Sequence, residues 1–294
     1  MKIGFIGLGS LGTPIAINLK ESGHELFVYN RTKSKATPLR DKGAVVCETI
    51  EALAKSCSIV FTIVSDDAAL KSICEGNNGL IQYLPEGAIH ISMSTILPQT
   101  AADLFALHQQ HGQHYLAAPV FGRPEAAVAR KMNFVYSGNE AIGKEMEPLM
   151  KDAGGAGVWN FGESITAANT VKLCGNFMIA SALEAMGESI ALASNSGVDA
   201  AKMWSMFNQT LFNTALYHNY SNIILQQKFE PAAFTAKLGL KDINLVLQQA
   251  SQVQQPMLLA ELLKENMQQL VSNGNDSIDW SAVAQGGLLR KQLV

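Results

Sequence analysis

Short apolar runs alternate with amphipathic stretches through the first half of the chain. Continuous apolar runs are typical of strands buried on both faces of a parallel sheet, whereas an apolar residue every three to four positions is typical of a helix. The alternation predicts a mostly parallel sheet with helices on both faces. The predicted strands are residues 3–6, 25–29, 58–64, 88–91, 115–118, 133–137 and 157–160.

The pattern changes after residue 162. Residues 164–196 lack proline and are apolar nearly all round, which predicts a buried helix of about thirty residues, roughly 45 Å long, that stops at Gly197. Helical patterns continue at 199–208, 233–252, 257–270 and 280–289, and no convincing strand follows residue 160. We therefore expect an α/β domain over 1–162 and an all-helical domain over 163–294.

A glycine motif lies between the first strand and the first helix. Gly7, Gly9 and Gly12 have the G-x-G-x-x-G spacing, and a second strand follows the helix. In this setting the glycines allow a tight turn, close approach of the backbone to a pyrophosphate, and close helix–strand packing. An ordinary glycine-rich turn is the alternative. The complete βαβ context favours a doubly wound, Rossmann-type dinucleotide site, with the loop Gly7-Leu8-Gly9-Ser10-Leu11-Gly12 on the phosphates.

The residues after the second strand indicate which dinucleotide binds. NAD-binding versions carry an acidic residue about twenty positions beyond the glycines, and here Asn30 stands there. Arg31 can fork onto phosphate oxygens, Thr32 can donate its hydroxyl, and Lys35 adds positive charge. The missing acid and the added cations predict NADP(H) rather than NAD(H). The alternative is that these cations form only a solvated loop.

Composition narrows the classes of protein to which the chain can belong. Hydrophobic residues make up 48% of the chain and charged residues 16%, and the net charge of −3 gives no basic surface for nucleic acid or membrane. The cysteines lack CxxC or metal-ligand spacing, so we expect reduced thiols and a cytoplasmic protein, with Cys174 a small apolar helix residue. The N-terminal segment is too glycine-rich for a signal peptide, and every apolar stretch is broken before it spans a membrane.

Lys172 is the most informative single residue. It lies early in the long apolar helix, where a lysine costs desolvation free energy unless it has a partner or a task. Burial lowers the pKa of a lysine, as general acid–base catalysis requires. Asn176, four positions on, shares its helix face and can fix a substrate oxygen. The alternative is a lysine that extends to solvent at the helix start.

Two other groups of residues give weaker evidence of a functional site. Lys241-Asp242 is a second charged pair on a helix, although an exposed pair of this kind is commonplace. The spacing of His108, His111 and His114 predicts no metal site.

Several motifs in this order resemble the β-hydroxyacid dehydrogenases. They are GLGSLG, YNRT, SMSTILP, APVFG, NTVKLCGN and LGLKD, and they extend from residue 2 to about residue 249. The resemblance implies hydride transfer between a nicotinamide and a small 3-hydroxy acid or its semialdehyde, in a cleft between two domains. Lys172 then matches the catalytic lysine and Asn176 the asparagine that accompanies it.

The resemblance also implies binding roles for other residues. Ser94 and Thr95 match a pair beside nicotinamide and substrate, Val64 and Ser65 flank the cofactor ribose, and Lys241 with Asp242 matches a pair that closes on the cofactor. One motif departs from the family. The family reads Ser-Gly-Gly where this chain has Phe121-Gly122-Arg123, so we expect Gly122 and Arg123 to contact the substrate.

The departure leaves the substrate open. Arg123 can replace the missing serine as a carboxylate anchor or can point to solvent, and Phe121 makes the pocket bulkier and more apolar. The alternatives are therefore an imine or ketone reductase on the same scaffold, or a non-catalytic NADP-binding or interaction protein. The apolar helical half also predicts a homodimer or homotetramer.

Overall fold

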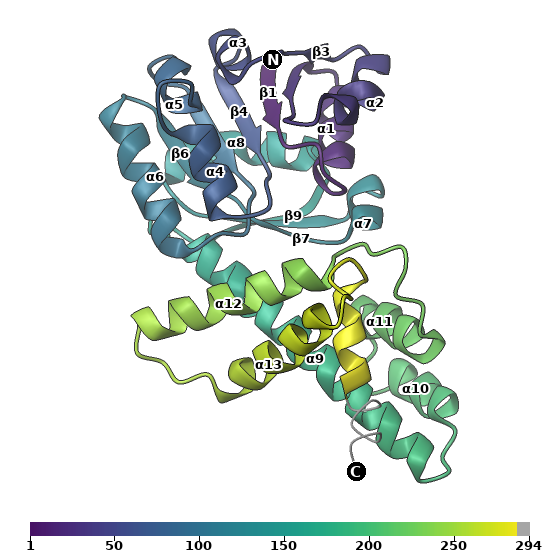
Figure 1. The fold of residues 1–294 in the computed structure, drawn as a ribbon. Coiled ribbons are helices and arrows are strands. Elements are labelled where there is room, and N and C mark those ends of the chain that lie inside the picture. The colour runs from purple at the N-terminus through teal and green to yellow at the C-terminus, as the bar shows by residue number, and fades with distance from the viewer. Residues whose placement is uncertain (287–294) are drawn as a thin grey trace. The chain divides into compact units, whose positions relative to one another are not determined.

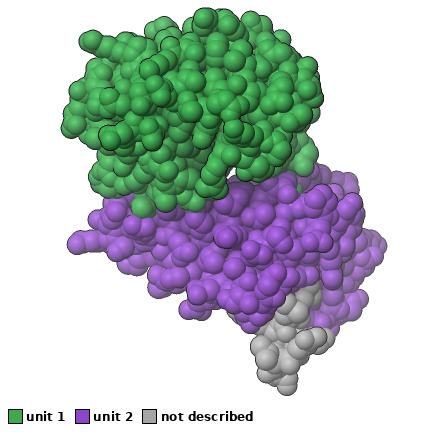
Figure 2. Space-filling view, turned by 45° about the horizontal axis from the view of Figure 1, so that its top comes forward, with its two compact units in different colours: residues 1–172 green, residues 173–294 purple. Residues whose placement is uncertain are grey.

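The computed structural model describes residues 1–286 of the chain, which divides into two compact units, Met1–Lys172 and Leu173–Val294 (Figure 2). Each unit has its own hydrophobic core. The division falls within one helix, later than the boundary expected at residue 162.

The first unit is built on a six-stranded parallel sheet in the order β3-β2-β1-β4-β5-β6 (Figure 1). This is the strand order of a Rossmann-type dinucleotide-binding sheet, so the predicted fold is confirmed. The strand order reverses between β1 and β4, and open α/β sheets bind their ligands at such a point. The strands are β1 (Lys2–Ile6), β2 (Glu25–Tyr29), β3 (Val45–Val46), β4 (Ile59–Thr62), β5 (Ile89–Ser92) and β6 (His114–Ala117).

Eight α-helices and one 3-10 helix precede the long helix. They are α1 (Gly12–Glu21), η1 (Lys33–Ala36), α2 (Thr37–Asp41), α3 (Ile50–Ser56), α4 (Asp67–Cys74), α5 (Leu80–Tyr83), α6 (Pro98–Gln110), α7 (Pro124–Val128) and α8 (Glu140–Asp152). Side chains cap several of these helices, because Thr49, Asp66 and Asn139 each accept a backbone N–H at the start of α3, α4 and α8.

The last predicted strands of this half do not join the main sheet. They form a separate three-stranded sheet in the order β7-β8-β9, with β7 (Val120–Phe121) antiparallel to β8 (Met132–Tyr136) and β9 (Gly155–Asn160) parallel to it. The expectation of a single sheet was therefore wrong. A two-residue strand such as β7 is too short for periodicity to reveal.

The second unit is helical throughout its described part, apart from one isolated bridge between Thr235 and Asp279. The predicted helices at 199–208, 233–252 and 257–270 are confirmed with small shifts at their ends, whereas residues 280–285 form a 3-10 helix. Helix α11 was missed because its asparagine, histidine and tyrosine residues are weak helix formers. Residue 287 onward of the predicted helix 280–289 lies outside the described residues. The elements are α9 (Ala167–Asn195), α10 (Ala200–Gln209), α11 (Ala215–Gln226), α12 (Ala236–Gln252), α13 (Leu258–Ser272) and η2 (Trp280–Gln285).

The long helix α9 ends where predicted. Gly197 has a φ of +76°, which a residue without a side chain adopts at least cost, and Val198 N donates to Ala193 O at 2.9 Å. Contrary to expectation, α9 is long and apolar enough to cross a membrane. Its residues Leu183, Met186 and Ile190 belong to the core of the second unit, and 44% of its most apolar window is buried.

Candidate functional site

The parallel strands direct the predicted site residues to one edge of the sheet. The glycine loop follows β1, Val64 and Ser65 follow β4, and Ser94 and Thr95 follow β5. Because β1, β4 and β5 are adjacent and parallel, their carboxyl ends lie together. The sheet thus assembles residues that are far apart in the sequence.

The three glycine positions of the loop differ in whether the fold leaves room for a side chain. A Cβ at Gly7 would lie 2.0 Å from Ile63 O, and Gly7 has a φ of +103°. A Cβ at Gly12 would lie 2.0 Å from Gly7 O, so this position is closed by the loop itself. A Cβ at Gly9 would have nothing within 4 Å. The fold therefore requires Gly7 and Gly12, whereas Gly9 keeps open a space beside the backbone.

The N-terminus of α1 is suited to an anion. No side chain caps this helix and its first turn contains no acidic residue, in contrast to α3, α4 and α8. Its first N–H groups and the positive end of its dipole are therefore available to phosphate oxygens. An uncapped helix start behind an open glycine fits a dinucleotide pyrophosphate.

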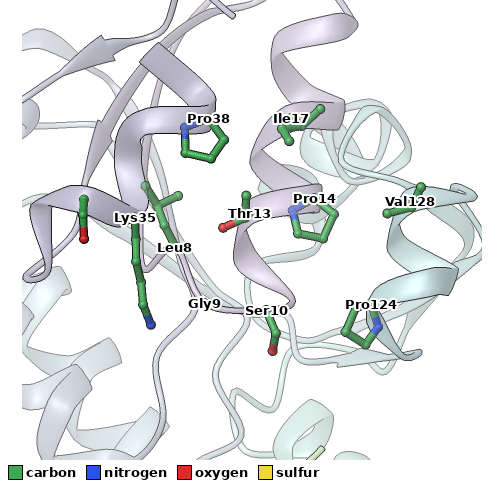
Figure 3. Close-up of a pocket in the computed structure, with 11 residues that line it drawn as sticks. Leu8, Gly9, Ser10, Thr13, Pro14, Ile17, Lys35, Pro38, Pro124 and Val128 are labelled. Atoms are coloured by element: carbon green, nitrogen blue, oxygen red, sulfur yellow. The ribbon is translucent and has the colours of Figure 1, made fainter. Parts of the chain in front are cut away.

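A pocket of about 530 Å³ lies along this helix (Figure 3). Pro38 and Lys35 stand on one side of α1, and Pro124 and Val128 of α7 stand on the other. Lys35 is the one cation of the lining, which contains no carboxylate. The lining residues are Leu8, Gly9, Ser10, Thr13, Pro14, Ile17, Ser34, Lys35, Pro38, Pro124 and Val128.

Asn30 supports the glycine loop from the end of β2. Its Oδ1 accepts a hydrogen bond from Leu8 N at 2.8 Å, and its Nδ2 donates to Thr32 O at 2.9 Å. The Asn30 side chain therefore holds the loop and the following turn together. Arg31, Thr32 and Lys35 are exposed around this turn.

Ser94 links the ends of β4 and β5. Its hydroxyl is buried and accepts a hydrogen bond from Val64 N at 2.9 Å. A second link joins Asp67 of α4 to Leu97 N at 2.9 Å. Ser94 thus positions Val64 as well as standing beside the half-buried Thr95.

Ser137 anchors the start of α9, a role that sequence reasoning missed. The residue directly follows β8, and its Oγ donates to Ile165 O at 3.1 Å and accepts from Ala168 N at 3.0 Å. Lys172 lies one helical turn beyond this anchor, so its backbone is held to the first unit.

The Lys172 ammonium lies over the ring of Phe121. Its Nζ is 4.2 Å from the ring centroid, well within the range of a cation–π contact. The lysine is half-buried in the structure. Arg123 also does not simply point to solvent, because its side chain is only 23% exposed and its Nε lies 3.8 Å from Glu125 Oε2.

In the second unit, Asp242 holds two predicted site residues. Asn176 Nδ2 donates to Asp242 Oδ2 at 2.5 Å, and Lys241 Nζ lies 2.7 Å from Asp242 Oδ1. Asp242 is 1% exposed, so the alternative of a commonplace exposed pair is wrong. A buried carboxylate needs such donors to offset its desolvation, and in return it fixes the direction of both side chains.

Sequence spacing singles out no group of cysteines and histidines, but the structure brings three of these residues together. Ligand atoms of Cys74, His90 and His108 all lie within 4.8 Å of one another in the core of the first unit. His90 Nδ1 lies 2.9 Å from His108 Nε2, which is hydrogen-bond distance, and 4.0 Å from Cys74 Sγ. The three residues come from α4, β5 and α6. Sequence spacing relates only residues on the same helix or strand, so it cannot reveal a cluster built from three elements.

The cluster is a directed chain of hydrogen bonds. The Gln113 amide donates to Ile81 O and Leu84 O, each at 2.9 Å, so its oxygen accepts from His108 Nδ1 at 2.9 Å. His108 Nε2 then accepts from His90 Nδ1, and His90 Nε2 accepts from the Thr62 hydroxyl at 2.8 Å. Each ring is neutral in this arrangement, and every polar hydrogen of the chain has an acceptor.

Acid is expected to destabilise the protein through this chain. Burial lowers the pKa of His108 from 6.5 to about 4 and that of His90 well below 6.5, while burial raises the pKa of the neighbouring Cys74 and Tyr115 and keeps both neutral. The unfolded chain therefore binds more protons than the folded one below pH 6.5, and stability falls from pH 6.5 towards 4. For His108 the loss at pH 5 is about 2 kcal/mol.

Urea unfolding at pH 7.5 and pH 5.0 measures this loss. The variant His108→Gln removes one titrating ring and should show a smaller difference between the two pH values. His111→Gln, at an exposed position, is the matched control. An equal pH dependence in His108→Gln and the wild type would contradict the assignment.

Comparison with known proteins agrees with this geometry. Residues 2–166 match the family model of the NAD binding domain of 6-phosphogluconate dehydrogenase, and residues 166–286 match that of the NAD-binding region of NADP-dependent 3-hydroxyisobutyrate dehydrogenase. The uncharacterized oxidoreductase YfjR of Bacillus subtilis is 40% identical over 96% of this chain and 98% of its own length. The 2-hydroxy-3-oxopropionate reductase of Escherichia coli is 28% identical over 97% and 96%.

Solved structures are similar over nearly the whole chain. Psf3 in complex with NADP+ and 2-OPP has a TM-score of 0.87 at 25% identity, covering 96% of this chain and 99% of that one. The imine reductase from Pseudomonas sp. has a TM-score of 0.63 at 19% identity, covering 96% and 97%, and shares the fold. The glycine loop, the strand order and both family matches together show that the chain is an NAD(P)-binding oxidoreductase and belongs to the β-hydroxyacid dehydrogenase family.

Proposed function

We propose that the protein transfers a hydride between NADP(H) and a small 3-hydroxy acid or its semialdehyde, with Lys172 as the general acid and base. The observation that carries the proposal is the placement of Lys172. Its helix is anchored by Ser137 in the unit that holds the glycine loop, and its ammonium is held over Phe121. An oriented lysine in a largely apolar setting is what proton transfer to a carbonyl oxygen requires.

Each group has a distinct task in the proposed reaction. NADP(H), when bound, supplies or accepts the hydride. Lys172 donates a proton to the carbonyl oxygen during reduction and removes it from the alcohol in reverse. Asn176, held by the buried Asp242, offers its amide to the same oxygen, and Thr95 and Arg123 orient the substrate.

The proposed function is tested by a substrate panel. NADPH oxidation is followed at the nicotinamide absorbance against glyoxylate, succinic semialdehyde, methylmalonate semialdehyde and tartronate semialdehyde, and the series is repeated with NADH. Turnover of at least one of these acids supports the proposal. Failure of all four in a protein that still binds NADPH would overturn it.

The proposed preference for NADP(H) rests on the turn after β2. Arg31, Thr32 and Lys35 are exposed there, and no carboxylate lines the adjacent pocket to repel a 2′-phosphate. The description of the matched C-terminal family as NADP-dependent and the NADP+ bound to Psf3 support the same preference.

Replacing Arg31 by alanine should weaken NADPH binding by about tenfold or more and leave NADH binding nearly unchanged, because only the 2′-phosphate engages the guanidinium. Fluorescence titration with both cofactors measures the two dissociation constants. Lys33→Ala is the control, since Lys33 pairs with Glu48 and does not line the pocket. Equal losses for NADPH and NADH would contradict the role of Arg31.

A specific observation favours one alternative. The aromatic ring beside Lys172 suits an apolar carbonyl or imine substrate, and an imine reductase shares the fold. Turnover of cyclic imines or alkyl ketones without turnover of the four acids would establish this alternative. A non-catalytic NADP-binding protein would turn over neither class.

We also propose a homodimer or homotetramer formed through the second unit. Large apolar side chains are exposed on it, among them Leu192 at 71%, Leu211 at 72% and Leu258 at 83%. Light scattering should show an oligomer that Leu192→Glu weakens and Ser194→Glu, an exposed neighbour on α9, does not. A monomeric wild type at micromolar concentration would overturn the proposal.

A further inference from the structure

Phe121 and Lys172 are positioned by the same strand, β8. Phe121 belongs to β7 and pairs with Asn133 of β8, while Ser137, directly after β8, anchors the helix that carries Lys172. Val120 is buried on the other face of β7, so the alternation of a strand turns the Phe121 ring away from that core. The contact between the ring and the ammonium is therefore fixed by the fold of the first unit.

The surface beside the ammonium is apolar on this side. The side chains of residues 120–122 contain no hydrogen-bond donor. Gly122 has a φ of +142°, and a Cβ there would lie 2.3 Å from the sulfur of the buried Met132, so no side chain can be added at this position. The next polar side chain, Arg123, lies beside Glu125.

An aromatic face attracts cations and repels anions because its quadrupole is negative above the ring plane. A carboxylate next to the reacting carbonyl would have to displace the ring from the ammonium or lie against its face, where the side chains of residues 120–122 offer no donor. The first arrangement gives up the cation–π contact, and the second leaves the carboxylate facing the ring without a side-chain donor from these residues, so both are costly. An alkyl group or a hydrogen atom in the same place packs on the ring at no such cost.

We infer that Phe121 is a specificity-determining residue, which selects carbonyl compounds whose carbonyl carbon bears hydrogen or alkyl groups and rejects 2-oxo acids. The inference rests on the proposed function and names its substrate class. A carboxylate is accepted only when methylene groups separate it from the carbonyl. In the reaction the carbonyl carbon gains a hydride from NADPH, the oxygen gains a proton from Lys172, and NADP+ and the alcohol are formed.

Two acid–ester pairs test the inference. Glyoxylate and methyl glyoxylate differ in charge next to the aldehyde, and succinic semialdehyde and its methyl ester differ in charge far from it. The free aldehyde fraction of each is measured by NMR, so that hydration does not distort kcat/KM. The wild type should prefer the ester by about tenfold or more in the first pair and by less than about threefold in the second.

Three substitutions distinguish the effect of the aromatic ring from the effect of the absent hydroxyl donor. Phe121→Ser adds a hydroxyl donor and should lower the ester preference for glyoxyl substrates by about tenfold or more. Phe121→Leu keeps an apolar side chain and should retain most of the preference. Phe121→Ala opens the same space as serine without a hydroxyl and should lie between them; it also carries the test if the serine variant does not fold.

The outcomes distinguish this inference from the proposed function. An unchanged ester preference in folded Phe121→Ser and Phe121→Ala, or a wild type that prefers glyoxylate, overturns the inference alone. A wild type that reduces none of the four compounds, or a Lys172→Ala variant with full activity, overturns the proposed function and the inference with it.

Discussion

Replacing Lys172 by alanine is expected to lower kcat by about 10²–10⁴-fold while NADPH binds as it does to the wild type. The expected loss is large because no other proton donor is assigned to the carbonyl oxygen. Binding should be preserved because Lys172 does not line the pocket beside the glycine loop, and the helix start is held by Ser137 rather than by the lysine. Steady-state kinetics and a fluorescence titration with NADPH measure the two effects separately.

Two further variants test whether the loss of activity is specific to proton transfer by Lys172. Lys172→Arg keeps the positive charge over Phe121 but cannot give up its proton, so its kcat should also collapse. Cys174→Ala, at an exposed position on the same helix, should keep wild-type activity. A Lys172→Ala variant with more than about half of the wild-type kcat would remove the lysine from the proposed mechanism.

The second large effect is expected at the glycine loop, where Gly12→Ala should destabilise the protein and Gly9→Ala should not. A Cβ at Gly12 would lie 2.0 Å from Gly7 O and 2.8 Å from Ile63 Cγ2, so α1 would have to move away from β1 and β4. Overpacking against the backbone should lower the free energy of unfolding by about 3 kcal/mol or more.

Gly9→Ala should instead weaken cofactor binding without affecting the stability of the fold. Its Cβ would enter open space, so the free energy of unfolding should change by less than about 0.5 kcal/mol. The same methyl group would occupy the approach to the α1 N-terminus and should weaken NADPH binding by about tenfold or more. Thermal unfolding and cofactor titration test both variants, and normal NADPH binding by Gly9→Ala would argue against the pyrophosphate assignment.

Much of the first unit follows from the sequence. The glycine motif, the helix after it and the two flanking strands lie within about thirty residues, so their packing is nearly local and the motif predicts it. Lys172 is recognisable because a lone lysine on an apolar helix contradicts the pattern around it. Substrate class and oligomeric state are not local properties, and both stay proposals.

Other features depend on strand order and register. The cluster of Cys74, His90 and His108 joins α4, β5 and α6, and no periodicity relates these positions. The sequence predicts β8 and β9 as part of the main sheet and misses β7, because the apolar pattern of a strand does not indicate which sheet the strand joins.

The sequence by itself determined the fold class and singled out the glycine loop and Lys172, since each depends on residue types at short spacing. Only the tertiary structure decided what these groups contact: Asp242 holding Asn176, Ser137 anchoring the helix of Lys172, and Phe121 beneath its ammonium. The physical reason is that such contacts join residues that are distant in the chain. Their formation depends on how buried charges and donors are satisfied across several packed elements, which no single segment encodes.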